Sequence, residues 1–154
     1  MLIKVYLAGD ISTDRWRLRV IEACRDLDIE FLSPIDNVSY SYQSLIAVHK
    51  VKQVFHFADQ MKVDKADIVL AFVKDGSPSL FSGTSWELGY AKAKGKVTIL
   101  INDMKPSLAC KYELIKRMAD IYCTSLEEGI DLLRELAFEM GFQPTERGSG
   151  EGVK

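Results

Sequence analysis

The amino-acid sequence predicts an α/β domain built on a mostly parallel β-sheet. Short apolar runs that suit strands covered on both faces alternate with longer stretches that carry apolar residues at helical spacing. Strands that alternate with helices are joined by right-handed crossovers, which place the strands parallel to one another. At 154 residues the chain is long enough for one well-packed core and too short for two.

Five strands are expected from the apolar runs. The first, third and fourth are continuously apolar, which is typical of parallel strands with helices packed on both faces. The five runs, in chain order, are Ile3–Ala8, Glu30–Leu32, Ile68–Val73, Val97–Ile101 and Asp120–Cys123.

Five helices are expected in the intervals. The first two carry apolar stripes at helical spacing, and the third stops at Gly95. The fourth follows Pro106, and the fifth opens with the capping-box pattern Ser-Leu-Glu-Glu and ends at Gly141. The five stretches are Asp14–Leu27, Ser44–Met61, Thr84–Lys94, Ser107–Met118 and Ser125–Met140.

The composition is that of an ordinary globular domain. A net charge of −2 indicates no overall attraction for a nucleic acid polymer or an anionic membrane. No apolar run approaches the roughly 18 residues that a membrane-spanning helix needs. We expect residues 1–141 to form one domain and residues 142–154, which contain little apolar surface, to be a flexible tail.

The sequence is read as that of a cytoplasmic protein. Its first residues lead directly into a strand, without the charged leader and apolar segment of a secretory signal. Its three cysteines are odd in number and lack CxxC spacing, which indicates reduced thiols. No metal site is expected, because His49 and His56 have no cysteine nearby and are interpreted as surface or packing residues. The cysteines are Cys24, Cys110 and Cys123.

Topology predicts where a ligand binds. In open parallel α/β sheets, ligands lie beyond the carboxyl ends of the strands, at the point where the strand order reverses. Three loops of this chain occupy such places, and two of them carry glycine beside acidic or hydroxyl residues. The loops are Gly9–Thr13, Lys74–Gly83 and Asn102–Pro106.

Glu87 is the leading candidate for a functional residue. The tetrapeptide Thr84-Ser85-Trp86-Glu87 fits a capping box, in which the glutamate satisfies a free backbone N–H group. The same first-turn position would stabilise the carboxylate as an anion, because helix N–H groups and the helix dipole favour negative charge there. An ionised carboxylate beyond the carboxyl end of a strand, where ligands bind, can act as a nucleophile. From these residues alone, both interpretations stay open.

Tyr6 and two aspartates are weighed in the same way. Tyr6 lies inside the first strand, where a buried hydroxyl needs a hydrogen-bond partner, and a neighbouring carboxylate would be a good one. Asp59 lies toward the end of the amphipathic stretch Ser44–Met61 and, taken alone, is read as a solvent-facing helix acid. Asp67, just before the third strand, is interpreted as a residue of the strand entry.

The loops also carry weaker candidates. Asp10 after Gly9 is a turn former, and Asp75 opens a segment that is a turn by composition. Hydroxyl groups gather before the third helix, a suitable place for a phosphate or sugar oxygen. Arg15 and Arg17 could contact an anion but are read as solvated. The hydroxyl residues are Ser77, Ser79, Ser82 and Thr84.

Together these residues resemble a known family. The resemblance is to the nucleoside 2-deoxyribosyltransferases, a superfamily that also contains deoxynucleoside 5′-monophosphate N-glycosidases. It extends over residues 3–140, and its most specific part is the block that contains Glu87. The motifs are Tyr6-Leu7-Ala8-Gly9, Asp59, Ala66-Asp67-Ile68-Val69 and Ser82-Gly83-Thr84-x-x-Glu87-Leu88-Gly89-Tyr90-Ala91.

The resemblance implies a fold and a mechanism. The fold is flavodoxin-like, with a five-stranded sheet in the order 2-1-3-4-5, in a homodimer or higher homo-oligomer whose sites are completed by a neighbouring subunit. Glu87 would attack C1′ of the sugar, displace the base and leave a glycosyl ester. Asp59 would orient the nucleophile or assist protonation of the leaving base, and Tyr6 would lie beside Glu87.

The implied partners are a nucleoside or nucleotide and a free base, and the chemistry requires no metal and no organic cofactor. In many transferases an aspartate precedes the glycine-containing motif, whereas Phe81 stands here. Pro78-Ser79-Leu80 is similar to a segment of the monophosphate hydrolases whose serine contacts the 5′-phosphate. The expected substrate-binding residues are Gly9, Asp10, Asp75, Ser79, Phe81, Ser82, Gly83 and Thr84.

Three functions therefore stay open. The first is transfer of a 2-deoxyribosyl group to another base, and the second is hydrolysis of a nucleoside 5′-monophosphate. The third is a nucleotide-binding module of the same fold without turnover. Phe81 leaves the choice between transfer and hydrolysis open, and Phe81 together with the altered loop before it motivates the third function.

Overall fold

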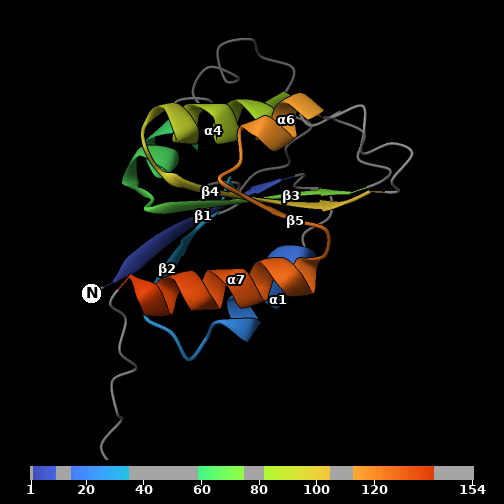
Figure 1. Ribbon diagram of the computed structural model, residues 1–154. Coiled ribbons are helices and arrows are strands. Elements are labelled where there is room, and N and C mark those ends of the chain that lie inside the picture. Colours follow the sequence, from blue (N-terminus) through green and yellow to red (C-terminus); the bar gives the residue numbers. More distant parts are fainter. Residues whose placement is uncertain (1, 10–14, 35–58, 75–81, 105–112, 141–154) are drawn as a thin grey trace, which may run out of the picture.

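The computed structural model describes residues 2–9, 15–34, 59–74, 82–104 and 113–140. They form three layers, with a central sheet between two layers of helices (Figure 1). Helices α4 and α6 cover one face of the sheet, and α1 and α7 cover the other. No helix within these ranges is long and apolar enough to span a bilayer.

The sheet has five parallel strands in the order β2-β1-β3-β4-β5, so the predicted flavodoxin-like fold and strand order are confirmed. The third strand sits beside the first, which makes the strand order reverse there. Each strand lies within two residues of its prediction. The strands are β1 (Ile3–Gly9), β2 (Ile29–Leu32), β3 (Ile68–Lys74), β4 (Val97–Asp103) and β5 (Ile121–Cys123).

The helices agree with the predictions in their core and differ at their ends. The expected fifth helix is confirmed, with Ser125 as its N-cap, accepting a hydrogen bond from the Glu128 N–H group. Gly95 has a φ of 72°, the left-handed conformation that ends the third expected helix. Residues 59–65 are helical, and residues 44–58 and 105–112 lie outside the described ranges. The helices are α1 (Arg15–Ala23), α4 (Ser82–Ala93), α6 (Glu113–Arg117) and α7 (Leu126–Glu139).

Helix α1 ends four residues before the predicted Leu27. Arg134 of α7 donates to the Ala23 carbonyl oxygen at 2.5 Å, and its two terminal nitrogens bind the Asp26 carboxylate at 2.6 and 2.7 Å. The guanidinium therefore satisfies a free carbonyl of the last helical turn and holds the following turn in place. The apolar stripe continues through Leu27 because that side chain still packs on the core from the turn.

Alternate residues of each strand pack into two separate hydrophobic cores, one on each face of the sheet. The side chains of Val5 and Leu7 pack toward α1 and α7, together with the buried free thiols Cys24 and Cys123. Tyr6 on β1 packs on the opposite side, toward α4 and α6. The period of two along a strand thus assigns Tyr6 to the face that α4 covers.

Two aspartates tie the amino ends of the strands together. The Asp67 carboxylate accepts a hydrogen bond from the Lys4 N–H group at 2.8 Å, so its interpretation as a strand-entry residue is confirmed. Asp120 accepts from the Thr98 N–H group at 2.9 Å and from Lys92 Nζ at 2.8 Å, and the Lys92 contact holds the pKa of Asp120 below its ordinary value. These contacts fix the end of the sheet away from α4's first turn.

Gly129 lets α7 approach the sheet closely. A Cβ atom placed on Gly129 would lie 2.2 Å from Ile101 Cδ1 and 2.4 Å from Cγ1, and Ile101 is fully buried. We expect Gly129→Ala to lower the free energy of unfolding by about 1–3 kcal/mol, because overpacking outweighs the helix propensity that alanine adds. Urea unfolding followed by circular dichroism measures this change.

Gly83 provides the matched control. It lies in α4, and a Cβ atom there would meet no atom within 4 Å. Gly83→Ala should leave the free energy of unfolding unchanged or raise it slightly. Equal stability of Gly129→Ala and the wild type would show that α7 can shift away from Ile101 at no cost.

Candidate active site

Glu87 lies on the buried side of α4. The helix begins at Ser82, and Glu87, which is only 8% exposed, falls in its second turn. Thr84, three residues earlier, is also buried, so both side chains face the sheet from one helical face. The capping-box interpretation of Glu87 is therefore wrong, since the first turn of α4 contains no acidic residue.

Tyr6 is the direct partner of Glu87. Its hydroxyl group donates a hydrogen bond to Glu87 Oε1 at 2.7 Å, between two buried side chains that are 81 residues apart in sequence. The expectation that the buried Tyr6 hydroxyl finds a carboxylate is confirmed. Strand β1 thus presents a phenol to the helix that follows β3, beside the point where the strand order reverses.

Burial decides the charge of Glu87. It raises the pKa of this carboxyl to about 7, and the negative charge of Asp59 acts in the same direction. The hydrogen bond from Tyr6 and the positive charges of Arg17 and Lys62 act in the opposite direction. The expectation that a helix start keeps Glu87 fully ionised is wrong, because Glu87 lies beyond the first turn and loses its hydration.

Tyr6 remains a neutral donor at any ordinary pH. Burial raises its pKa far above the usual range, and the charges of Glu87 and Asp59 raise it further. A phenol in this state gives its proton to a hydrogen bond without losing it. Its place beside the carboxylate suits it to orient one oxygen of Glu87 and leave the other oxygen for a reactant.

Asp59 belongs to the same cluster. It begins the helical residues 59–65 and is half-buried. Its charge raises the pKa of both Glu87 and Tyr6, so the three side chains share one electrostatic environment. Asp59 is therefore not a fully solvent-facing acid, and its charge acts on Glu87 and Tyr6.

Two cations near the cluster were missed by sequence reasoning. Arg17 was expected to be solvated, but it is 3% exposed and donates to backbone oxygens of β1. Lys62 is half-buried, and its Nζ atom donates to the Ser33 carbonyl oxygen. The signal for Arg17 was present, because it precedes Val20 by three residues and Cys24 by seven and so shares their apolar stripe.

The structure places some of the expected substrate-binding residues. Gly9 ends β1, where a Cβ atom would lie 2.8 Å from Trp16 Cζ2 and 3.0 Å from the Phe72 carbonyl oxygen, so a close approach explains this glycine. Ser82 and Gly83 begin α4. Asp10, Asp75, Ser79 and Phe81, together with His49, His56 and Cys110, lie outside the described ranges.

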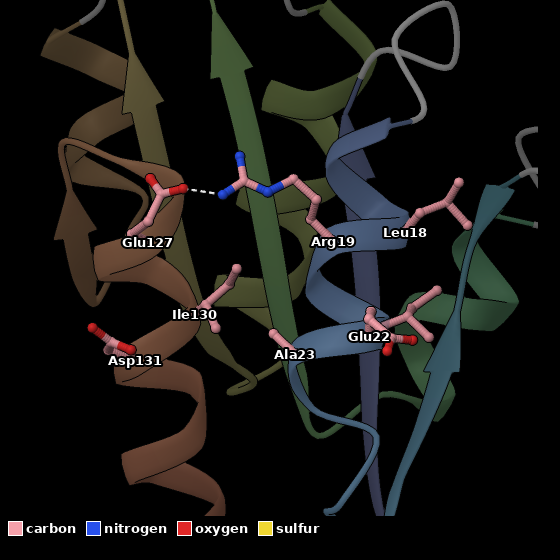
Figure 2. A pocket seen from close by; sticks show the side chains of 8 residues that line it. Leu18, Arg19, Glu22, Ala23, Glu127, Ile130 and Asp131 are labelled. Carbon is pink, nitrogen blue, oxygen red and sulfur yellow. Dashed lines mark hydrogen bonds and ion pairs between the residues drawn. The ribbon is translucent and has the colours of Figure 1, made fainter.

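A groove on the other side of the molecule is separate from this cluster. It runs between α1 and α7, where Arg19 and Glu127 form an ion pair across it (Figure 2). Leu18 and Ile130 contribute apolar side chains, and none of the predicted site residues lines it. The groove lies with α1 and α7 on the face of the sheet opposite to α4, away from Glu87 and Tyr6. We therefore place the candidate active site on the α4 face, at Glu87.

The fold and this cluster define a class of protein: a flavodoxin-like α/β domain with a buried carboxylate and phenol beside the point where the strand order reverses. The model of the nucleoside 2-deoxyribosyltransferase family matches residues 5–133. The chain belongs to the nucleoside 2-deoxyribosyltransferase family.

Solved structures show the same fold at low sequence identity. A 2-deoxyribosyltransferase of Bacillus psychrosaccharolyticus is 21% identical, with a TM-score of 0.62 over 81% of this chain and 88% of that one. The CMP N-glycosidase BcmB of Clostridium botulinum is 20% identical, with a TM-score of 0.50 over 86% of this chain and 98% of that one. A search of curated proteins gave no significant match.

Proposed function

We propose that this protein cleaves the N-glycosidic bond of a nucleoside or nucleotide through a covalent glycosyl ester on Glu87, and that it transfers the 2-deoxyribosyl group to another base. The observation that carries the proposal is the buried hydrogen bond of 2.7 Å between the Tyr6 hydroxyl group and Glu87. Family membership supports glycosyl transfer or N-glycosidic cleavage as the type of reaction.

The burial of Glu87 suits covalent catalysis. In the first step an oxygen of ionised Glu87 forms a bond to C1′, and the electron pair of the breaking C1′–N bond leaves with the base. The carboxylate loses its charge as the ester forms. A site that disfavours the buried anion therefore favours the neutral ester over the starting carboxylate. In the transition state the Glu87 carboxylate still carries part of its negative charge beside C1′, and this charge stabilises the positive charge that develops on the sugar.

Asp59 and Tyr6 have supporting roles in this proposal. Two acids whose charges interact, such as Asp59 and Glu87, lose their protons at different pH values. One of them can therefore hold a proton while the other is ionised. In the proposed reaction Asp59 orients Glu87 or assists proton transfer to the leaving base. Tyr6 holds Oε1, which directs the other oxygen of Glu87 to the sugar.

The second step decides between transfer and hydrolysis. In transfer, a nitrogen atom of an acceptor base attacks C1′ and releases Glu87; in hydrolysis, water does so. The likeness to a CMP N-glycosidase structure motivates 5′-monophosphates as the second substrate class to test. Both reactions pass through the same ester in this proposal.

The decisive experiment is an activity screen with product analysis. The purified protein is incubated with 2′-deoxynucleosides, ribonucleosides and their 5′-monophosphates, with and without a second free base, and the products are separated by chromatography. Transfer gives an exchanged nucleoside only when the acceptor base is present, and hydrolysis gives free base and sugar or sugar phosphate without it.

Mass spectrometry tests the intermediate directly. Acid quenching during turnover, followed by peptide mapping, should find a glycosyl adduct on the peptide that contains Glu87. Binding of nucleotides without any free base would identify a non-catalytic binding module and overturn the proposal. An adduct on another residue would overturn the role of Glu87 while leaving the reaction type in place.

A further inference from the structure

Asn102 is a buried polar residue near the carboxyl end of a central strand. It lies on β4 directly after the apolar residues Leu100 and Ile101, and it is 5% exposed. An amide group that is removed from water costs free energy unless hydrogen bonds replace those that it made to the solvent. The hydrogen bonds of Asn102 therefore indicate what this amide group is for.

The side-chain oxygen of Asn102 has a partner. The Met104 N–H group donates to Asn102 Oδ1 at 3.2 Å. A backbone N–H group can only donate, so the atom of the amide that faces it is the oxygen, and the nitrogen Nδ2 points away. A hydrogen bond from an asparagine oxygen to the backbone two residues on forms an Asx turn, which here closes the end of β4. This turn fixes the orientation of the amide group.

The side-chain nitrogen of Asn102 is left over. Nδ2 carries two N–H donors, and neither donates to a residue in the part of the chain that the structure describes. A serine or an aspartate would close the same turn through an oxygen atom and would bury no N–H group. The turn therefore explains the oxygen of Asn102 and leaves its nitrogen unexplained.

The period of two along β4 places Asn102 on the face of the sheet that carries Glu87. Ile101 packs into the core on the side of α1 and α7, whereas Leu100 packs into the core on the side of α4. Asn102 lies two residues after Leu100, so its side chain points to the α4 side. Met104, two residues further, packs against the same core.

Helix α4 covers this part of the sheet. It packs on β1, β3 and β4, so Tyr6 on β1 and Asn102 on β4 lie under one helix, the helix that carries Glu87 (Figure 1). In the register of the sheet Asn102 lies beside Val73, close to the end of β3. Ligands of open parallel sheets bind beyond the carboxyl ends of the strands. Asn102 is therefore on the face of Glu87 and at the edge from which a ligand approaches.

We propose that Asn102 is a substrate-binding residue, whose Nδ2 amide donates a hydrogen bond to an acceptor atom of the nucleoside or nucleotide that reacts at Glu87. The identity of the ligand rests on the proposed function. A nitrogen that can only donate selects a group with lone pairs, such as a base carbonyl, a ring nitrogen or a sugar or phosphate oxygen. A substrate without this acceptor leaves the N–H groups buried and unpaired, so Asn102 contributes to substrate choice.

NMR observes this amide directly, because the chain has two asparagines, Asn37 and Asn102. Labelling with ¹⁵N-asparagine gives two side-chain amide signals, and that of Asn102 is assigned by its absence in Asn102→Asp. The probes are 2′-deoxyadenosine, 2′-deoxycytidine and their 5′-monophosphates, added to Glu87→Gln, which lacks the proposed nucleophile. We expect a bound probe to move the Asn102 signal.

Asn102→Asp and Asn102→Ser separate the amide nitrogen from the turn. Both replacements keep an oxygen that can accept from the Met104 N–H group, and both remove Nδ2. We expect the Kd of the probe, measured by calorimetry, to rise about 5- to 10-fold in each, as for the loss of one hydrogen bond. Serine adds no charge, so an effect common to both does not come from a new carboxylate.

Asp103→Asn is the matched control, a change at the neighbouring exposed position that should leave the Kd unchanged. Substrate analogues then identify the acceptor: 5′-deoxy and 3′-deoxy sugars, bases without a carbonyl group, and nucleosides compared with 5′-monophosphates. The analogue that lacks the acceptor should bind equally to the wild type and to Asn102→Ser, because the hydrogen bond is already absent. Weakening of every analogue by the same factor would show a purely structural role and overturn the inference.

The outcomes separate this inference from the proposed function. A probe that binds without moving the Asn102 signal, and with the same Kd in Asn102→Ser, overturns the role of Asn102 even where the wild type releases base. A shifted signal and weaker binding in the variants, with no base released by the wild type, overturn the proposed function and support the role of Asn102. If none of the four probes binds, both are overturned.

Discussion

Replacing Glu87 with glutamine is expected to reduce base release by about 1,000-fold or more, because the variant lacks the nucleophile on which the covalent step depends. Glutamine has nearly the same size and can still accept the Tyr6 hydrogen bond through its amide oxygen. Single-turnover kinetics with the best substrate of the activity screen measures the effect. A rate of base release close to that of the wild type would contradict the nucleophilic role of Glu87.

The same variant should be more stable than the wild type at high pH. The pKa of Glu87 in the folded protein is about 7, against an ordinary value of 4.5, so the folded state holds this proton more tightly than the unfolded chain. The stability that comes from the protonated form is complete below pH 4.5 and is lost as the pH rises through 7. Glutamine imitates the neutral form at every pH.

Thermal unfolding as a function of pH checks this expectation. Above pH 7, Glu87→Gln should unfold at a higher temperature, with a gain on the order of 2–3 kcal/mol, and below pH 4.5 the two proteins should be similar. Loss of activity together with gained stability is the signature of a residue kept for chemistry. An equal melting temperature at pH 8 would show that Glu87 is not strained by burial.

Tyr6→Phe is expected to lower kcat/KM at pH 7 by about 10- to 100-fold, since a hydrogen bond to a charged group contributes about 1.5–3 kcal/mol. The Tyr6 hydroxyl group lowers the pKa of Glu87, so its removal should raise that pKa. The acidic limb of the pH profile should therefore move to higher pH, and part of the lost activity should return at pH 8–9.

Tyr90→Phe is the matched control for this prediction. Tyr90 also lies on α4, but its hydroxyl group donates to Asp64 Oδ1 at 2.8 Å and not to Glu87. The acidic limb should stay in place when Tyr90 is changed. A Tyr6→Phe profile lowered uniformly, without displacement, would show that Tyr6 packs beside Glu87 without tuning its ionisation.

The sequence allowed the fold to be predicted in detail. Continuous apolar runs have few alternatives to buried parallel strands, and the resemblance carried the strand order, so the prediction of the sheet was nearly complete. The pairing of Tyr6 with a carboxylate was also predictable, because a buried hydroxyl group requires a partner. These properties depend on local pattern and on single-residue chemistry.

The electrostatics of the site depended on tertiary packing and could not be predicted in the same way. Local pattern placed the start of α4 at Thr84, and the observed start at Ser82 moves Glu87 from the first helical turn to the second. That small change replaces a dipole-stabilised anion with a desolvated one. The apolar stripe that Arg17 shares with Val20 indicated its burial, but its hydrogen bonds to the Leu7 and Gly9 carbonyl groups depend on how α1 packs against β1.

The two cores on opposite faces of the sheet have a practical consequence for engineering. The proposed chemistry lies on the α4 face, whereas α7 and most of α1 pack on the other face. Among the described residues, Arg17 of α1 is a group from that layer whose charge acts on Glu87. Substitutions far apart and without shared partners have nearly additive effects. A library restricted to α7 and the outer positions of α1 can therefore be selected for thermostability alone, leaving substrate preference to a second library on the α4 side.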